Sequence, residues 1–183
     1  MMSIQEKYNF VLPEDQLDYY VGQEMDEVIK NLDAEAVECE GATAELERLA
    51  KTGEYRMAVV SSSAKPRVIA SVKKVGQDKF FPDDIIFSAA TSLERPTTKP
   101  DPAIYLHAME VVGAKPESSL AVEDSKSGAM SAIRAKIHTV AYVGSYPQDE
   151  QEEKAKMLMG LGCEALMHKW AEFPEILKKI EEA

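Results

Sequence analysis

The sequence contains few cysteines and no long apolar run. Its 183 residues include two cysteines, Cys39 and Cys163, which lie far apart and show no metal-ligand spacing. We therefore expect two reduced thiols, and neither a disulfide framework nor a zinc site. No apolar segment approaches the roughly 18 residues that cross a bilayer. The opening residues MMSIQEKYNF lack the apolar core of a signal peptide, so we expect a cytoplasmic protein with no membrane partner.

Positive charge is also scarce. The chain has 21 Lys and Arg residues against 32 Asp and Glu residues, which gives a net charge of −11. A surface that binds nucleic acid must be basic, so we expect no nucleic-acid partner. A small anion remains compatible with this charge, because a local cationic cluster or a bound metal ion can override it. We expect a monomer with a sizeable core.

The apolar pattern indicates an α/β fold. Short apolar runs alternate with helical patterns along most of the chain. The expected strands cover residues 57–60, 85–87, 120–122, 139–143 and 165–167. The expected helices cover residues 14–36, 42–51, 66–75, 102–112, 127–135, 148–161 and 173–182. Short strands separated by helices predict a doubly wound, Rossmann-like parallel sheet that is covered on both faces.

Polar residues lie in three predicted loops, two of which directly follow a strand and one of which precedes a helix. Ser61 and Ser62 come after the strand at 57–60, Lys99 precedes the helix at 102–112, and Glu123 and Asp124 follow the strand at 120–122. Ligands of doubly wound sheets bind beyond the carboxyl ends of the strands. Each residue alone has an ordinary explanation, since serines cap helices, lysines coat surfaces and acidic residues favour helix N-termini. Two adjacent carboxylates that end a buried strand also suit a hard cation such as Mg²⁺.

Three segments in this order resemble the haloacid dehalogenase superfamily, specifically its β-phosphoglucomutase-like phosphatases and phosphomutases. The segments are AVVSSSAKP, TTKPDPAIY and AVEDSKSGAMSAI, within a resemblance that covers roughly residues 14–145. The resemblance implies that Ser61 and the Ser62 backbone bind a phosphoryl group. It implies that Lys99 is a catalytic, phosphate-binding residue, and that Glu123 and Asp124 hold Mg²⁺. Phosphoryl transfer requires that the negative charge on the phosphoryl oxygens is neutralised, which a lysine, a hydroxyl and a cation can do.

One part of the family pattern is missing. The family begins with a central strand that ends in Asp-x-Asp, whose first aspartate forms an aspartyl-phosphate. No Asp-x-Asp occurs in the 183 residues, and Asp83 and Asp84 are adjacent and precede a strand. The resemblance therefore implies a truncated sequence that starts midway through a helical cap. Residues 1–38 would be the cap remnant, and residues 39–183 a Rossmann-like core that lacks its first central strand.

Two functional hypotheses follow. The first is a haloacid dehalogenase-like phosphatase or phosphomutase for a small phosphorylated metabolite such as a sugar phosphate, whose present chain is inactive because it lacks the nucleophile. The second is a non-catalytic relative that binds phosphate and Mg²⁺. A phosphorelay receiver domain is disfavoured, because its acidic pair comes early in the chain and its lysine late. Without the central strand, its two neighbours would have unpaired inner edges or would pair directly with each other. Unpaired backbone groups in a sheet centre are costly, so we expect marginal stability.

Overall fold

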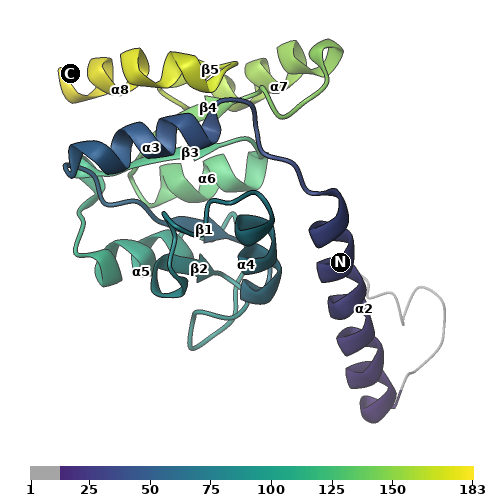
Figure 1. The fold of residues 1–183 in the computed structure, drawn as a ribbon. Coiled ribbons are helices and arrows are strands. Elements are labelled where there is room, and N and C mark those ends of the chain that lie inside the picture. The colour runs from purple at the N-terminus through teal and green to yellow at the C-terminus, as the bar shows by residue number, and fades with distance from the viewer. Residues whose placement is uncertain (1–12) are drawn as a thin grey trace.

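The computed structural model describes residues 13–183, so the part of the predicted cap remnant at residues 1–12 lies outside the described residues. The helices follow in chain order as α2 (Glu14–Glu35), α3 (Ala42–Thr52), α4 (Lys65–Lys74), α5 (Ala103–Val112), α6 (Lys126–Arg134), α7 (Gln148–Gly160) and α8 (Phe173–Glu181) (Figure 1). The strands are β1 (Val59–Ser61), β2 (Ile86–Ser88), β3 (Leu120–Glu123), β4 (His138–Tyr142) and β5 (Ala165–Met167). Three short 3₁₀ turns lie at Asp83–Ile85, Pro116–Ser118 and Trp170–Glu172. The order of elements is the predicted one.

All strand pairs are parallel. β1 pairs with β2, with Val60 opposite Phe87, and β4 lies between β3 and β5 in a three-stranded sheet. Each consecutive strand is reached through a helical crossover, the arrangement that parallel pairing requires. The predicted α/β class with parallel strands is confirmed.

Helices cover both faces of the strands, because neighbouring strand residues point to opposite sides. In β4, Val140 and Tyr142 pack with residues of α3 and α8, whereas Ala141 and Val143 at its end pack with α6 and α7. In β2, Ile86 faces α4, while Phe87 faces α5 and α6. The layers are therefore α3, α4 and α8 on one side of the strands and α5, α6 and α7 on the other.

The strands form two separate sheets instead of one. Among residues 13–183, β1 forms a ladder only with β2, and β3 only with β4. All three residues of β1 are half-buried, whereas all three residues of β2 are fully buried. One edge of β1 is paired with β2, and its other edge forms no ladder with any strand of residues 13–183. Side-chain packing still joins the two sheets, since Val60, Phe87 and Ala121 share one apolar cluster.

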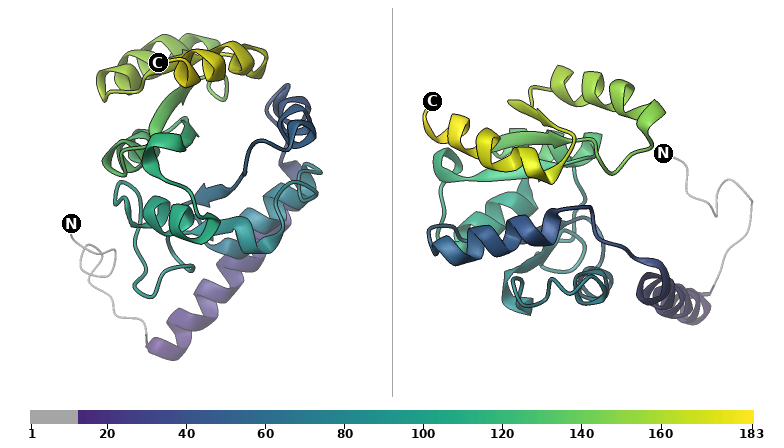
Figure 2. Two further views of the ribbon diagram at one scale, coloured as in Figure 1. Left: turned by 90° about the vertical axis from the view of Figure 1, so that its left-hand side faces the viewer. Right: turned by 45° about the horizontal axis from the view of Figure 1, so that its top comes forward.

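Helix α2 stands apart from the β3–β4–β5 sheet and lies beside α4 (Figure 2). Arg67 of α4 makes the polar contacts between the two helices. Its guanidinium group forms an ion pair with Glu24, and its Nε lies 3.4 Å from the sulfur of Met25. The connection to α3 is open to solvent, as Val37 is 86% exposed. None of the described helices combines the length and the apolar character that crossing a membrane would need.

Candidate functional site

Three loops meet at the carboxyl ends of β1 and β3. Lys99 Nζ lies 2.5 Å from Glu123 Oε1 and donates a hydrogen bond of 2.9 Å to the carbonyl oxygen of Val60. The Lys99 backbone N–H donates to Ser62 Oγ at 3.2 Å. Carbonyls alternate in direction along a strand. Because Ser61 O accepts from Ala89 N on the β2 side, Val60 O points to the opposite edge of β1. Ser62, Lys99 and Glu123 are therefore brought together.

The Lys99–Glu123 ion pair is buried. The side chains of the two residues are 7% and 9% exposed. Charges removed from water are stable only when further polar partners satisfy them. Tyr105 provides this support, because its hydroxyl donates to Glu123 Oε1 and its ring centroid lies 4.8 Å from Lys99 Nζ. Burial, followed by the adjacent Glu123 carboxylate, raises the pKa of Tyr105 well above its usual value, so the hydroxyl stays protonated and can donate.

A glycine makes room for the Glu123 carboxylate. A Cβ atom on Gly128 would lie 1.8 Å from Glu123 Oε2 and 2.3 Å from its Cδ. Gly128 lies in the first turn of α6, where its N–H donates to the capping hydroxyl of Ser125 at 3.0 Å. The first turn of α6 thus lies directly against the Glu123 carboxylate. The AVEDSKSGAMSAI segment therefore needs a glycine at position 128.

Helix α6 also holds the loop that carries Lys99. Arg134 donates to the carbonyl of Pro100 at 2.9 Å, and the buried Ser131 hydroxyl donates to the carbonyl of Asp101 at 2.7 Å. The Asp101 carboxylate accepts from the N–H of Ala103 at 2.8 Å, at the start of α5. Lys99 is therefore positioned by a loop that both neighbouring helices restrain.

The serine loop after β1 has its own support. Ser61 Oγ accepts a hydrogen bond of 3.1 Å from the N–H of Ser63, so it bonds within its own loop and makes no contact with Lys99 or Glu123. Ser88 at the end of β2 is fully buried and donates to the carbonyl of Ser63 at 2.7 Å. This bond fixes the loop beside the candidate site.

The two predicted metal ligands have different surroundings. Glu123 Oε1 already accepts from Lys99 and Tyr105, whereas among the described residues Asp124 Oδ2 accepts a single 3.3 Å bond, from the Ser145 hydroxyl. Over residues 13–183, no three His, Cys, Asp or Glu side chains gather closely enough to hold a metal ion. The donor set thus fits Mg²⁺ only in part, with Asp124 as the carboxylate that has fewer described partners. The metal and phosphate roles of the predicted residues stay predictions.

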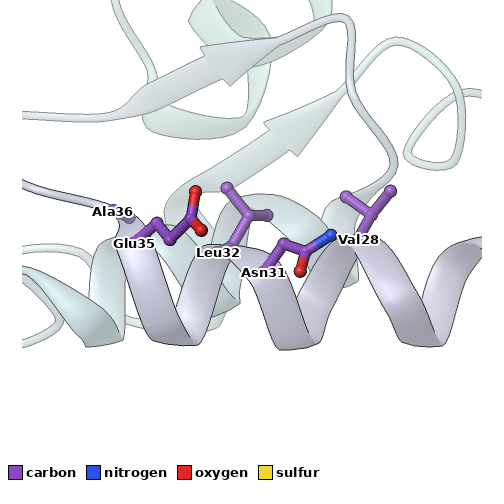
Figure 3. Close-up of a pocket in the computed structure, with 5 residues that line it drawn as sticks. All are labelled: Val28, Asn31, Leu32, Glu35 and Ala36. Atoms are coloured by element: carbon purple, nitrogen blue, oxygen red, sulfur yellow. The ribbon is translucent and has the colours of Figure 1, made fainter.

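Two hollows of the described surface lie elsewhere. One runs along α2 and is lined by Val28, Asn31, Leu32, Glu35 and Ala36 (Figure 3). The other lies at the α2–α3 connection, beside Cys39 and Trp170. Neither hollow is lined by any of the predicted site residues, which lie at the rim formed by the carboxyl ends of β1 and β3.

Sequence reasoning missed Tyr105 and Ser88 as site residues. Ser88 follows the apolar residues of β2, so the rule that selected Ser61 and Ser62 would also have selected it. Tyr105 lies inside the TTKPDPAIY segment, but only the turn of α5 shows that it faces Lys99. From the sequence alone, Tyr105 would be interpreted as an aromatic residue of the core.

Comparison with known proteins relates this geometry to a family. The family model of haloacid dehalogenase-like hydrolases matches residues 2–142. The 6-phosphogluconate phosphatase of Escherichia coli is 32% identical over 109 residues, which are 60% of this chain and 46% of that protein. A phosphorylated carbohydrates phosphatase of Thermotoga maritima is 28% identical over 130 residues, covering 71% of this chain and 55% of that protein. The chain thus spans about half the length of these relatives.

A solved structure agrees in fold. The crystal structure of a haloacid dehalogenase-like protein from Agrobacterium tumefaciens superposes with a TM-score of 0.74 at 23% identity, over 97% of this chain and 75% of that one. At 23% identity, this similarity supports the fold and not a function. The family model, however, covers more than half of the sequence and includes all three segments that meet at the rim. The chain therefore belongs to the haloacid dehalogenase-like hydrolases.

Proposed function

We propose that this chain provides the phosphate-binding and metal-binding rim of a phosphatase that acts on a small phosphorylated carbohydrate. The observation that carries the proposal is the meeting of Ser62, Lys99 and Glu123 beside Asp124 at the carboxyl ends of β1 and β3. A lysine ammonium, loop N–H groups and a cation can together neutralise a phosphoryl group. The relatives named for 6-phosphogluconate and phosphorylated carbohydrates support the substrate class.

The nucleophile in this proposal is an aspartate that the 183 residues do not supply. It would lie on a strand between β1 and β3, which form no ladder with each other and, among residues 13–183, pair only with β2 and β4. That position places a carboxylate at the end of the strand close to Lys99, the geometry that attack on phosphorus requires. Mg²⁺ would be held through Asp124 together with such an aspartate, and would balance charge on the phosphoryl oxygens. A cytoplasmic location and a monomeric state belong to the same proposal.

A non-catalytic role in binding phosphate and Mg²⁺ is the second candidate. One observation favours it for the chain as it stands, since Lys99 is already neutralised by Glu123. Both candidates predict that inorganic phosphate binds in the presence of Mg²⁺. Titration calorimetry should show this binding in wild type and its loss in Asp124→Asn.

Turnover separates the two candidates. A version extended by an N-terminal strand that ends in Asp-x-Asp should hydrolyse p-nitrophenyl phosphate, and 6-phosphogluconate more efficiently, with Mg²⁺. The same version with Asn-x-Asp should be inactive. Phosphatase activity that is equal in the two versions would remove the phosphatase proposal, while phosphate binding without any turnover would favour the non-catalytic role.

A further inference from the structure

We infer that Tyr105 is a positioning residue that orients both members of the Lys99–Glu123 pair. This inference rests on the proposed function and deepens it. Tyr105 lies on α5, within the buried cluster between the two sheets. Its hydroxyl bonds Glu123 Oε1 and its ring lies against Lys99 Nζ. A single buried side chain thus contacts the anion and the cation at once.

The carboxylate oxygen needs this second donor. Glu123 Oε1 has two lone pairs, of which Lys99 uses one and Tyr105 the other. The other oxygen, Oε2, is confined on the side of Gly128, where no Cβ is present. Tyr105 and Gly128 therefore fix the Glu123 carboxylate from two sides. The carboxylate in turn positions the Lys99 ammonium group through their ion pair.

The ring acts on the ammonium group directly. An aromatic face within about 6 Å of a cation attracts it, most strongly away from water. Lys99 has four rotatable side-chain bonds, and fixing them has an entropic cost. The ring, the Val60 carbonyl and the Glu123 carboxylate together restrict Lys99 Nζ to one location. For a phosphoryl group at the rim, this pre-organised ammonium requires no reorganisation on binding.

The test measures how accessible Lys99 is in the full 183-residue chain. Acetylation of each lysine by acetic anhydride is followed by mass spectrometry in wild type and in Tyr105→Phe. Phenylalanine keeps the ring but removes the hydrogen bond to a charged group, so acetylation of Lys99 should accelerate about tenfold while other lysines keep their rates. Tyr55→Phe is the matched control, because Tyr55 donates a 2.8 Å bond to Glu181 on the exposed surface.

A double substitution distinguishes positioning from a general packing role. If Tyr105 acts on Lys99 through Glu123, Tyr105→Phe should add little to the acetylation rate of Glu123→Gln. Equal Lys99 rates in wild type and Tyr105→Phe would overturn the inference. A parallel rise at every lysine would also overturn it, because it would indicate a loosened fold.

The proposed function fails independently of this inference, namely if wild type binds no inorganic phosphate in the presence of Mg²⁺. The acetylation results do not depend on that binding.

Discussion

At the scale of single residues, Gly128 controls the space that Glu123 occupies. We expect Gly128→Ala to destabilise the protein by about 1–3 kcal/mol, as overpacked sites do. The added methyl group would overlap a carboxylate that Lys99 and Tyr105 hold in place. Urea denaturation followed by circular dichroism measures the change.

Gly160→Ala is the control for that substitution. Gly160 is also helical, and a Cβ atom there has no neighbour within 4 Å. Its replacement should leave stability unchanged or raise it by about 0.5 kcal/mol. If Gly128→Ala behaved like Gly160→Ala, the close approach of Glu123 to α6 would not exist in solution.

Cys163 gives the stability a dependence on alkaline pH. Burial, with a smaller effect of the Glu123 charge, raises the pKa of the Cys163 thiol from 9.0 to about 11. Between these values the unfolded chain loses the thiol proton and the folded chain keeps it, so stability falls as the pH rises. We expect Cys163→Ala to show a shallower fall between pH 9 and 11. Thermal melts of wild type and Cys163→Ala across this range test it, and an equally steep fall in the two proteins would contradict the prediction.

The contacts of single residues were only partly predictable from the sequence. The positions of Ser62 and Glu123 after apolar runs, and of Lys99 before the next helix, indicated that they would meet, because parallel strands end at one edge. The sequence could not show that Glu123 would pair with Lys99 and Tyr105 instead of standing free beside Asp124. The pairing of Glu123 depends on the directions of the side chains on α5 and α6, which the apolar periodicity of the sequence does not determine.

At the scale of elements, α2 is joined to the rest of the protein mainly through α4. We expect Arg67→Ala to loosen α2, since Arg67 contacts both Glu24 and Met25. Exposed ion pairs contribute only about 0–1 kcal/mol, so the melting temperature should change little. Amide hydrogen exchange should instead accelerate within residues 19–35 and stay unchanged in β3–β5.

Lys79→Ala is the matched control for the attachment of α2. Lys79 forms an exposed 2.8 Å ion pair with Glu47 of α3, and it pairs with none of the α2 side chains that the structure describes. Its replacement should leave exchange in α2 at the wild-type rate. Equal protection of α2 in the Arg67 and Lys79 variants would show that apolar contacts alone hold this helix.

Element boundaries were predicted well from the sequence. The strand at Ala165–Met167 and the start of the helix at Ala42 were predicted at their observed residues, and the start of β1 was two residues off. Apolar runs and capping residues are local signals, which explains this success. The separation of β1 from β3 is not local, and no pattern within either strand encodes it. It was expected only from the resemblance to a family with a further strand.

At the scale of the whole molecule, we expect stability to depend on whether a further strand pairs with the edges of β1 and β3 that face away from β2 and β4. We expect the chain alone to unfold at low temperature, and an added N-terminal strand ending in Asp-x-Asp to raise the melting temperature by about 10 °C or more. The strand would bring ladder hydrogen bonds to both inner edges. Differential scanning calorimetry of the two versions measures this rise.

The control for this prediction is an extension of equal length with a scrambled, Gly- and Ser-rich sequence. It should leave the melting temperature of the chain unchanged. A cooperative transition at high temperature in the chain alone would contradict the prediction, because the two sheets would then need no further strand.

The hydrogen bond from Lys99 to Val60 O has a consequence for how the site would be assembled. The ammonium group occupies the acceptor that a neighbouring strand would use for its own N–H. If a further strand paired with this edge of β1, its N–H would share Val60 O with the ammonium group or displace it. The location of Lys99 Nζ would then depend on whether this edge of β1 is paired.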